Sequence, residues 1–156
     1  MKQTRALAAF FAVATAFVFA PAALSAQEQQ APPPAVAGAY SLAMVGEAEL
    51  PALLGEADGC RREITAASLT LEPTNQWSLE AQVRETCGEQ VAEKTAKQQG
   101  TYTVSDQNVT FVVTPAAEQA DPATSIEIDP LTSATITDGA LIAQLGEVAQ
   151  TFTFRR

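Results

Sequence analysis

The side chains that could do chemistry in this chain are carboxylates and two cysteines, because its 156 residues include no histidine. The absence of histidine excludes Ser-His-Asp and Cys-His catalysis and any His-ligated zinc site. Two cysteines are also too few for a four-thiolate metal site. The chemistry left to consider is that of carboxylates and of one cysteine pair.

Four acidic residues cluster in one stretch: Glu47, Glu49, Glu56 and Asp58. Their oxygens could bind Ca²⁺, but they lack the fixed spacing and the central glycine of a calcium loop, so a solvated acidic loop is favoured. Two carboxylates could also hydrolyse a glycosidic bond, but nothing in the sequence places a pair at the required separation. We therefore predict no enzyme activity, no metal and no cofactor.

The charge balance argues against polyanionic partners. The chain carries 9 Lys and Arg against 18 Asp and Glu, a formal net charge of −9. Binding to nucleic acid or to an anionic membrane surface needs concentrated Lys and Arg. We expect neither partner.

The N-terminus has the layout of a secretory signal peptide. Basic residues Lys2 and Arg5 precede an apolar run over 6–20, and small residues lead to Ala26. We predict cleavage after Ala26, export to a periplasm or to the medium, and no membrane embedding of the mature chain. The residue directly after the cleavage point is Gln27 and not a cysteine, so a lipoprotein is not expected. Removing residues 1–26 takes away two bases and no acids, which shifts the net charge to −11.

The mature chain divides into a leader and one domain. Residues 27–37 contain three consecutive prolines and predict a disordered or polyproline leader. Residues 38–156 read as short strands with period-2 alternation, separated by turns, and only Glu47 to Glu56 hints at a helical turn. Eight or nine strands with short connections predict an all-β, antiparallel up-and-down barrel of about eight strands.

The two cysteines lie at the ends of a predicted hairpin, and its register places them opposite each other. A three-residue turn at Pro73-Thr74-Asn75 would place Leu71 opposite Trp77. Toward the start of the first strand, the apolar positions change from odd to even numbers, as from Leu69 to Ile64. A one-residue bulge at 65–67 would keep them on the same face. Beyond that bulge, Ile64 faces Val83, Arg62 faces Glu85, and Cys60 faces Cys87. We predict a Cys60–Cys87 disulfide, which the export signal also favours.

Several segments together resemble the small exported bacterial lipocalin-like β-barrel proteins. They are Gly38-Ala39-Tyr40-Ser41-Leu42, Cys60 with Ile64-Thr65, Trp77-Ser78-Leu79, Arg84-Glu85-Thr86-Cys87-Gly88, Gly100-Thr101-Tyr102-Thr103-Val104 and Phe152-Thr153-Phe154-Arg155-Arg156. Lipocalins carry Gly-x-Trp in the first strand and an Arg near the chain end that packs on that Trp. Here Gly38-x-Tyr40 occupies the first place, and Arg155 or Arg156 could occupy the second. The resemblance implies an eight-stranded barrel that could hold a small apolar ligand.

The alternation predicts a set of inward-facing residues that would either line a ligand cavity or fill the barrel. The set is Tyr40, Leu42, Met44, Leu71, Trp77, Leu79, Val83, Tyr102, Phe111 and Phe152. The first functional hypothesis is therefore a binding protein for a small hydrophobic molecule. The second is a protein-binding module, such as the bacterial metalloprotease inhibitors, which insert an N-terminal segment like the leader 27–37 into a protease. A structural module of the envelope is a third.

Overall fold

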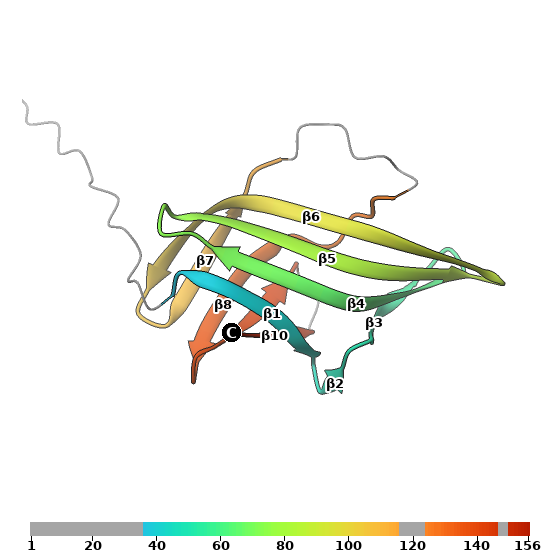
Figure 1. The fold of residues 1–156 in the computed structure, drawn as a ribbon, viewed down its shortest axis with the longest axis horizontal. Helices are drawn as coiled ribbons and strands as arrows, with labels where there is room; N and C mark the ends of the chain where they lie inside the picture. Colours follow the sequence, from blue (N-terminus) through green and yellow to red (C-terminus); the bar gives the residue numbers. More distant parts are fainter. Residues whose placement is uncertain (1–35, 116–123, 147–149) are drawn as a thin grey trace, which may run out of the picture.

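The computed structural model describes residues 36–115, 124–146 and 150–156, which form ten strands and no helix (Figure 1). The predicted signal peptide and most of the predicted leader lie outside these residues. The strands are β1 (Gly38–Val45), β2 (Ala48–Glu49), β3 (Ala52–Ala57), β4 (Cys60–Leu71), β5 (Gln76–Cys87), β6 (Gln90–Ser105), β7 (Asn108–Val113), β8 (Leu131–Thr137), β9 (Ala140–Leu145) and β10 (Thr151–Arg155).

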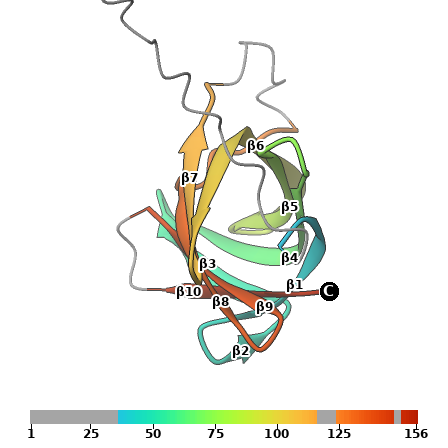
Figure 2. The ribbon, with the colours of Figure 1, turned by 90° about the vertical axis from the view of Figure 1, so that its left-hand side faces the viewer.

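Eight of these strands close into an antiparallel barrel, as the sequence predicts. Strands β4 to β10 follow one another as sequential antiparallel neighbours, and β1 closes the ring by pairing with both β10 and β4. Figure 2 looks along this ring from the left-hand side of Figure 1. Closure matters because it leaves no unpaired edge around the barrel wall.

One edge of β4 is divided between two partner strands, β1 and β3, while its other edge pairs with β5. Its second half, from Ser68 to Leu71, pairs with β1, whereas its first half, from Cys60 to Ile64, pairs with β3. The first halves of β4 and β6 and the second half of β5 therefore project beyond the ring, toward the right of Figure 1. The helical turn predicted over 47–56 is wrong, since this stretch forms β2 and β3 on either side of Pro51.

The β4–β5 hairpin has the predicted register. Leu71 pairs with Trp77, a shift falls between Ile64 and Ala66, and Cys60 pairs with Cys87, with which it forms the predicted disulfide. At the turn, the Glu72 amide donates to the Gln76 carbonyl at 2.8 Å. Asn75 takes the left-handed conformation, with φ 64°, that ends a three-residue loop.

Two further hairpins also follow the sequence. In β6 and β7, Tyr102 pairs with Phe111. The β8–β9 turn has positive φ at both Asp138 and Gly139, as a type I′ turn requires. These local turns set which residues of each strand face the core.

The core contains nine of the ten residues predicted to face inward, and Met44 is the exception. A register shift between Leu42 and Met44, where β1 meets β10, turns the strand by one residue. Val45 is buried as a result, and Met44 is only half-buried. Because the alternating pattern of the first strand is short, it does not reveal a bulge within the strand. The inward position predicted for Met44 is therefore wrong.

At the end of the barrel where β1 begins, the C-terminal arginine packs on an aromatic residue of the first strand. Arg156 lies over the Tyr40 ring, 5.0 Å from its centroid, and its Nη2 donates to the Tyr40 hydroxyl at 2.9 Å. The same hydroxyl donates to the Val36 carbonyl at 2.7 Å, and Val36, in the predicted leader, is itself buried. Arg156, not Arg155, thus takes the place expected for an arginine on the first-strand aromatic.

Candidate functional site

A cavity of about 200 Å³ lies at the opposite end of the barrel, where β4 and β5 project. We call it the mouth cavity. Its lining includes Gly55 and eight apolar side chains: Leu54, Ala57, Ile64, Val83, Ile126, Ile128, Leu145 and Phe152. Five polar ones complete it: Glu56, Arg62, Glu127, Asp129 and Gln150.

The inner wall of the mouth cavity comes from the β4–β5 hairpin. Ile64 and Val83 face each other across the two strands and are both buried. They form the residue pair next to the β4 bulge, and the bulge determines that both side chains face inward. Strand β3 adds Leu54 on one side, and Leu145 and Phe152 come from β9 and β10.

The segment 124–130 forms the other side of the cavity. It runs along the part of β6 that extends beyond the pairing with β7. There the Thr95 amide donates to the Thr124 carbonyl at 2.8 Å, and the Ile126 amide donates to the Thr95 carbonyl. Further on, the Gln98 amide nitrogen donates to the Ile128 and Asp129 carbonyls, while its oxygen accepts from the Leu131 amide. Backbone bonds with Thr95 and the side chain of Gln98 together hold the segment that carries Ile126 and Ile128.

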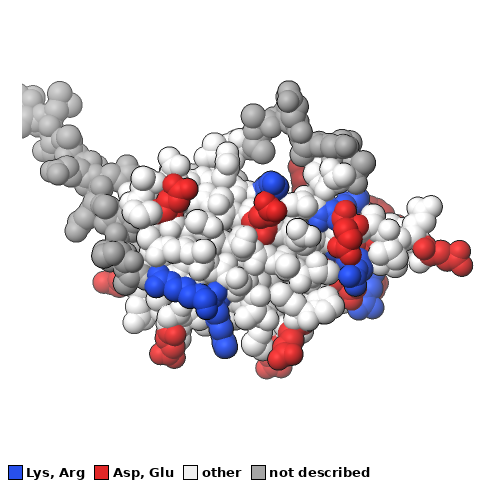
Figure 3. Space-filling model, in the orientation of Figure 1, with Lys and Arg blue, Asp and Glu red and all other residues white. Residues whose placement is uncertain are grey.

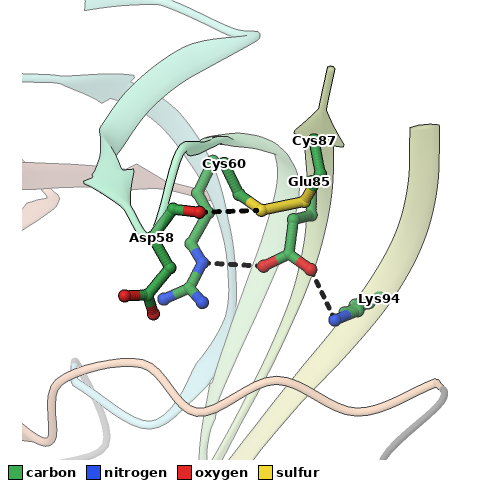
Figure 4. The surroundings of a disulfide bond; sticks show 6 residues. Asp58, Cys60, Glu85, Cys87 and Lys94 are labelled. Carbon is green, nitrogen blue, oxygen red and sulfur yellow. Dashed lines mark hydrogen bonds and ion pairs between the residues drawn. A yellow bond between two sulfur atoms is a disulfide. The ribbon is translucent and has the colours of Figure 1, made fainter. Parts of the chain in front are cut away.

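A charged cluster of Arg62, Glu85 and Lys94 adjoins the cavity on the inner face of the projecting strands. The Glu85 carboxylate accepts a hydrogen bond from Arg62 Nε at 2.8 Å and one from Lys94 Nζ at 2.6 Å (Figure 4). The side chains are 35%, 10% and 20% exposed for Arg62, Glu85 and Lys94. The hydrogen bond from Lys94, followed by that from Arg62, lowers the pKa of Glu85 below its ordinary value near 4.5.

This cluster predicts a pH dependence of stability. A carboxyl group whose pKa is lowered by folding stabilises the folded state above its ordinary pKa, and this contribution is lost as the pH falls through the lower value. We expect the free energy of unfolding of the wild type to exceed that of Glu85→Gln by a constant amount above about pH 5 and by progressively less below it. Urea unfolding of both proteins between about pH 7 and pH 2 measures the difference. A difference that does not change with pH would contradict the assignment.

The predicted inward-facing residues divide between the two ends of the barrel. Only Val83 and Phe152 line the mouth cavity, whereas most of the others pack deeper in the barrel. There, Phe111 meets Trp77 edge to face at 5.2 Å, and Tyr102 lies 6.4 Å from Phe111. The deep half of the barrel is therefore filled by aromatic rings, and open volume remains at the mouth.

Most residues of the cavity lining are not among those predicted from the sequence. Ile126 and Ile128 alternate with Glu127 and Asp129, a period-2 signal that could have marked this segment as half-buried. Leu54 lay within the stretch interpreted as a helical turn. Leu145 is the last residue of β9. These residues are ordinary apolar types, so only the tertiary fold brings them together around one cavity.

The acidic residues considered for Ca²⁺ do not form a site together. Glu56 borders the mouth cavity, Glu47 lies in the β1–β2 connection, and Glu49 ends β2. Over residues 36–115, 124–146 and 150–156, no three His, Cys, Asp or Glu side chains are placed to hold a metal ion. The same residues contain no helix long and apolar enough to cross a membrane.

Comparison with protein-family models, with curated proteins and with solved structures finds no match for this chain.

Proposed function

We propose that this protein is an exported binding protein, not an enzyme, that holds a small apolar molecule at the open end of its barrel. The observation that carries the proposal is the mouth cavity of about 200 Å³ with its eight apolar lining residues. Binding sites for small molecules are typically concave, mostly apolar and supplied with a few polar groups. The mouth cavity has these properties.

The size and position of the cavity limit the ligand. Pockets that bury drug-sized molecules are typically about 300–1,000 Å³. A cavity of about 200 Å³ suits a smaller molecule, such as a short alkyl chain or an aromatic ring system. The rings of Trp77, Phe111 and Tyr102 occupy the deeper barrel, so the ligand would sit between the β4–β5 hairpin and segment 124–130.

Blocking the cavity tests this proposal, and adjacent residues of β3 provide a matched pair of variants. Leu54 lines the cavity, whereas Leu53 is 43% exposed and does not. We expect Leu54→Trp to fill the cavity and to weaken binding of the neutral fluorescent probe N-phenylnaphthylamine by about tenfold or more. Leu53→Trp, with the same added volume outside the cavity, should bind the probe as the wild type does.

Fluorescence titration of the three proteins gives the dissociation constants, and thermal unfolding checks that both variants fold. A wild type that does not bind the probe, or two variants that lose affinity equally, would refute the proposal.

The inhibitor hypothesis depends on the leader 27–37, of which the structure describes only Val36 and Ala37. Val36 is anchored beside Tyr40, at the end of the barrel opposite the mouth cavity. The described part of the leader therefore lies at the other end of the barrel from the proposed binding site. The inhibitor hypothesis stays a prediction, as does a purely structural role in the envelope.

A further inference from the structure

The charged residues around the mouth cavity are mostly acidic. Glu56 from β3 and Glu127 and Asp129 from segment 124–130 all border the opening, and all three are exposed. Across the part of the chain that the structure describes, none of these three carboxylates has an ion-pair partner. They are available to a ligand from two separate elements of the fold.

Arg62, the one basic residue in the lining, already has an ion-pair partner. Its Nε donates to the Glu85 carboxylate at 2.8 Å, and the same carboxylate accepts a hydrogen bond from Lys94 Nζ at 2.6 Å. Across these six side chains, four negative charges face two positive ones. Charges of both signs gather over this end of the molecule in Figure 3.

We infer that the ligand of the mouth cavity is a cationic amphiphile, with an alkyl or aryl group in the cavity and an amine at its rim. The inference rests on the proposed function and specifies its ligand class. An ammonium group at the opening would lie near carboxylates from both sides while its apolar part displaces water from Ile64, Val83 and Phe152. The formal net charge of −9 acts in the same direction, because it attracts cations and repels anions at long range.

Three ligands with the same alkyl chain separate charge from apolar binding. Octylamine, octanol and octanoate are titrated against the complex of the wild type with N-phenylnaphthylamine. An exposed charge pair changes an affinity by roughly 1.5- to 5-fold, so three carboxylates should make octylamine about tenfold tighter than octanol at low salt. Octanoate should be the weakest of the three. The preference for octylamine should shrink as salt is added, because screening acts on charges and leaves the apolar contact unchanged.

Two triple variants with equal charge changes provide the control. Glu56→Gln, Glu127→Gln and Asp129→Asn together remove the rim carboxylates. Glu72→Gln, Asp106→Asn and Asp138→Asn together remove three carboxylates from turns at the opposite end of the barrel. We expect the rim variant to bind octylamine and octanol about equally and the far-end variant to keep most of the preference.

The outcomes distinguish the two proposals. If the wild type does not bind the neutral probe, the proposed function fails. If it binds the probe but prefers octylamine no more than octanol, or if the far-end variant loses the preference as fully as the rim variant, the apolar site stands and the cationic ligand class is overturned.

Discussion

Reduction of the Cys60–Cys87 disulfide is expected to lower the free energy of unfolding by about 3–4 kcal/mol. The bond joins residues separated by 27 positions and links β4 to β5 where both strands project beyond the barrel ring. In the chain-entropy model, a cross-link across a loop of this length stabilises mainly by restricting the unfolded chain.

Urea unfolding of the oxidised and the reduced protein measures the loss. The double variant Cys60→Ser with Cys87→Ser should match the reduced wild type, because both lack the covalent link. The m-value should rise on reduction, since the unfolded chain without the cross-link exposes more surface. A loss below about 1 kcal/mol would show that the cross-link restrains an unfolded state that is already compact.

Replacing Trp77 with alanine is expected to destabilise the protein by about 3–5 kcal/mol. The side chain is only 2% exposed and packs edge to face on Phe111, with ring centroids 5.2 Å apart. Its Nε1 also donates to the Thr101 carbonyl at 3.1 Å, and this acceptor would lose its partner. Gly100 lies beside the indole, since a Cβ added there would be 3.0 Å from Nε1 and 1.9 Å from the Val112 carbonyl oxygen. The backbone around Trp77 is therefore too close-packed to collapse readily into the space left by the alanine.

Thermal or urea unfolding of Trp77→Ala, compared with Val112→Ala, tests this expectation. Val112 is 61% exposed on strand β7, so its truncation should change the free energy of unfolding by less than about 0.5 kcal/mol. Equal effects of the two substitutions would contradict the assignment of Trp77 to the core.

The hairpin from Cys60 to Cys87 could be predicted residue by residue because its information is local. A three-residue turn fixes the register, and a period of two fixes which side chains share a face. The β4 bulge was also predictable, since the apolar phase changes between Leu69 and Ile64 while the cysteines and one ion pair must still meet. The mouth cavity had no such signal, because its lining comes from five strands and from a segment outside the strands.

The sequence by itself determined the all-β class, the β4–β5 register, the disulfide and the inward position of most core side chains. Only the tertiary structure decided that β1 closes the ring between β4 and β10, that Val45 replaces Met44 in the core, and that Arg156 rather than Arg155 covers Tyr40. It also decided that the aromatic rings fill one end of the barrel and leave the other open. The physical reason is that turns and alternation act between neighbours in the chain. Closure, in contrast, depends on pairings between residues more than 100 positions apart, as between Ser41 and Arg155.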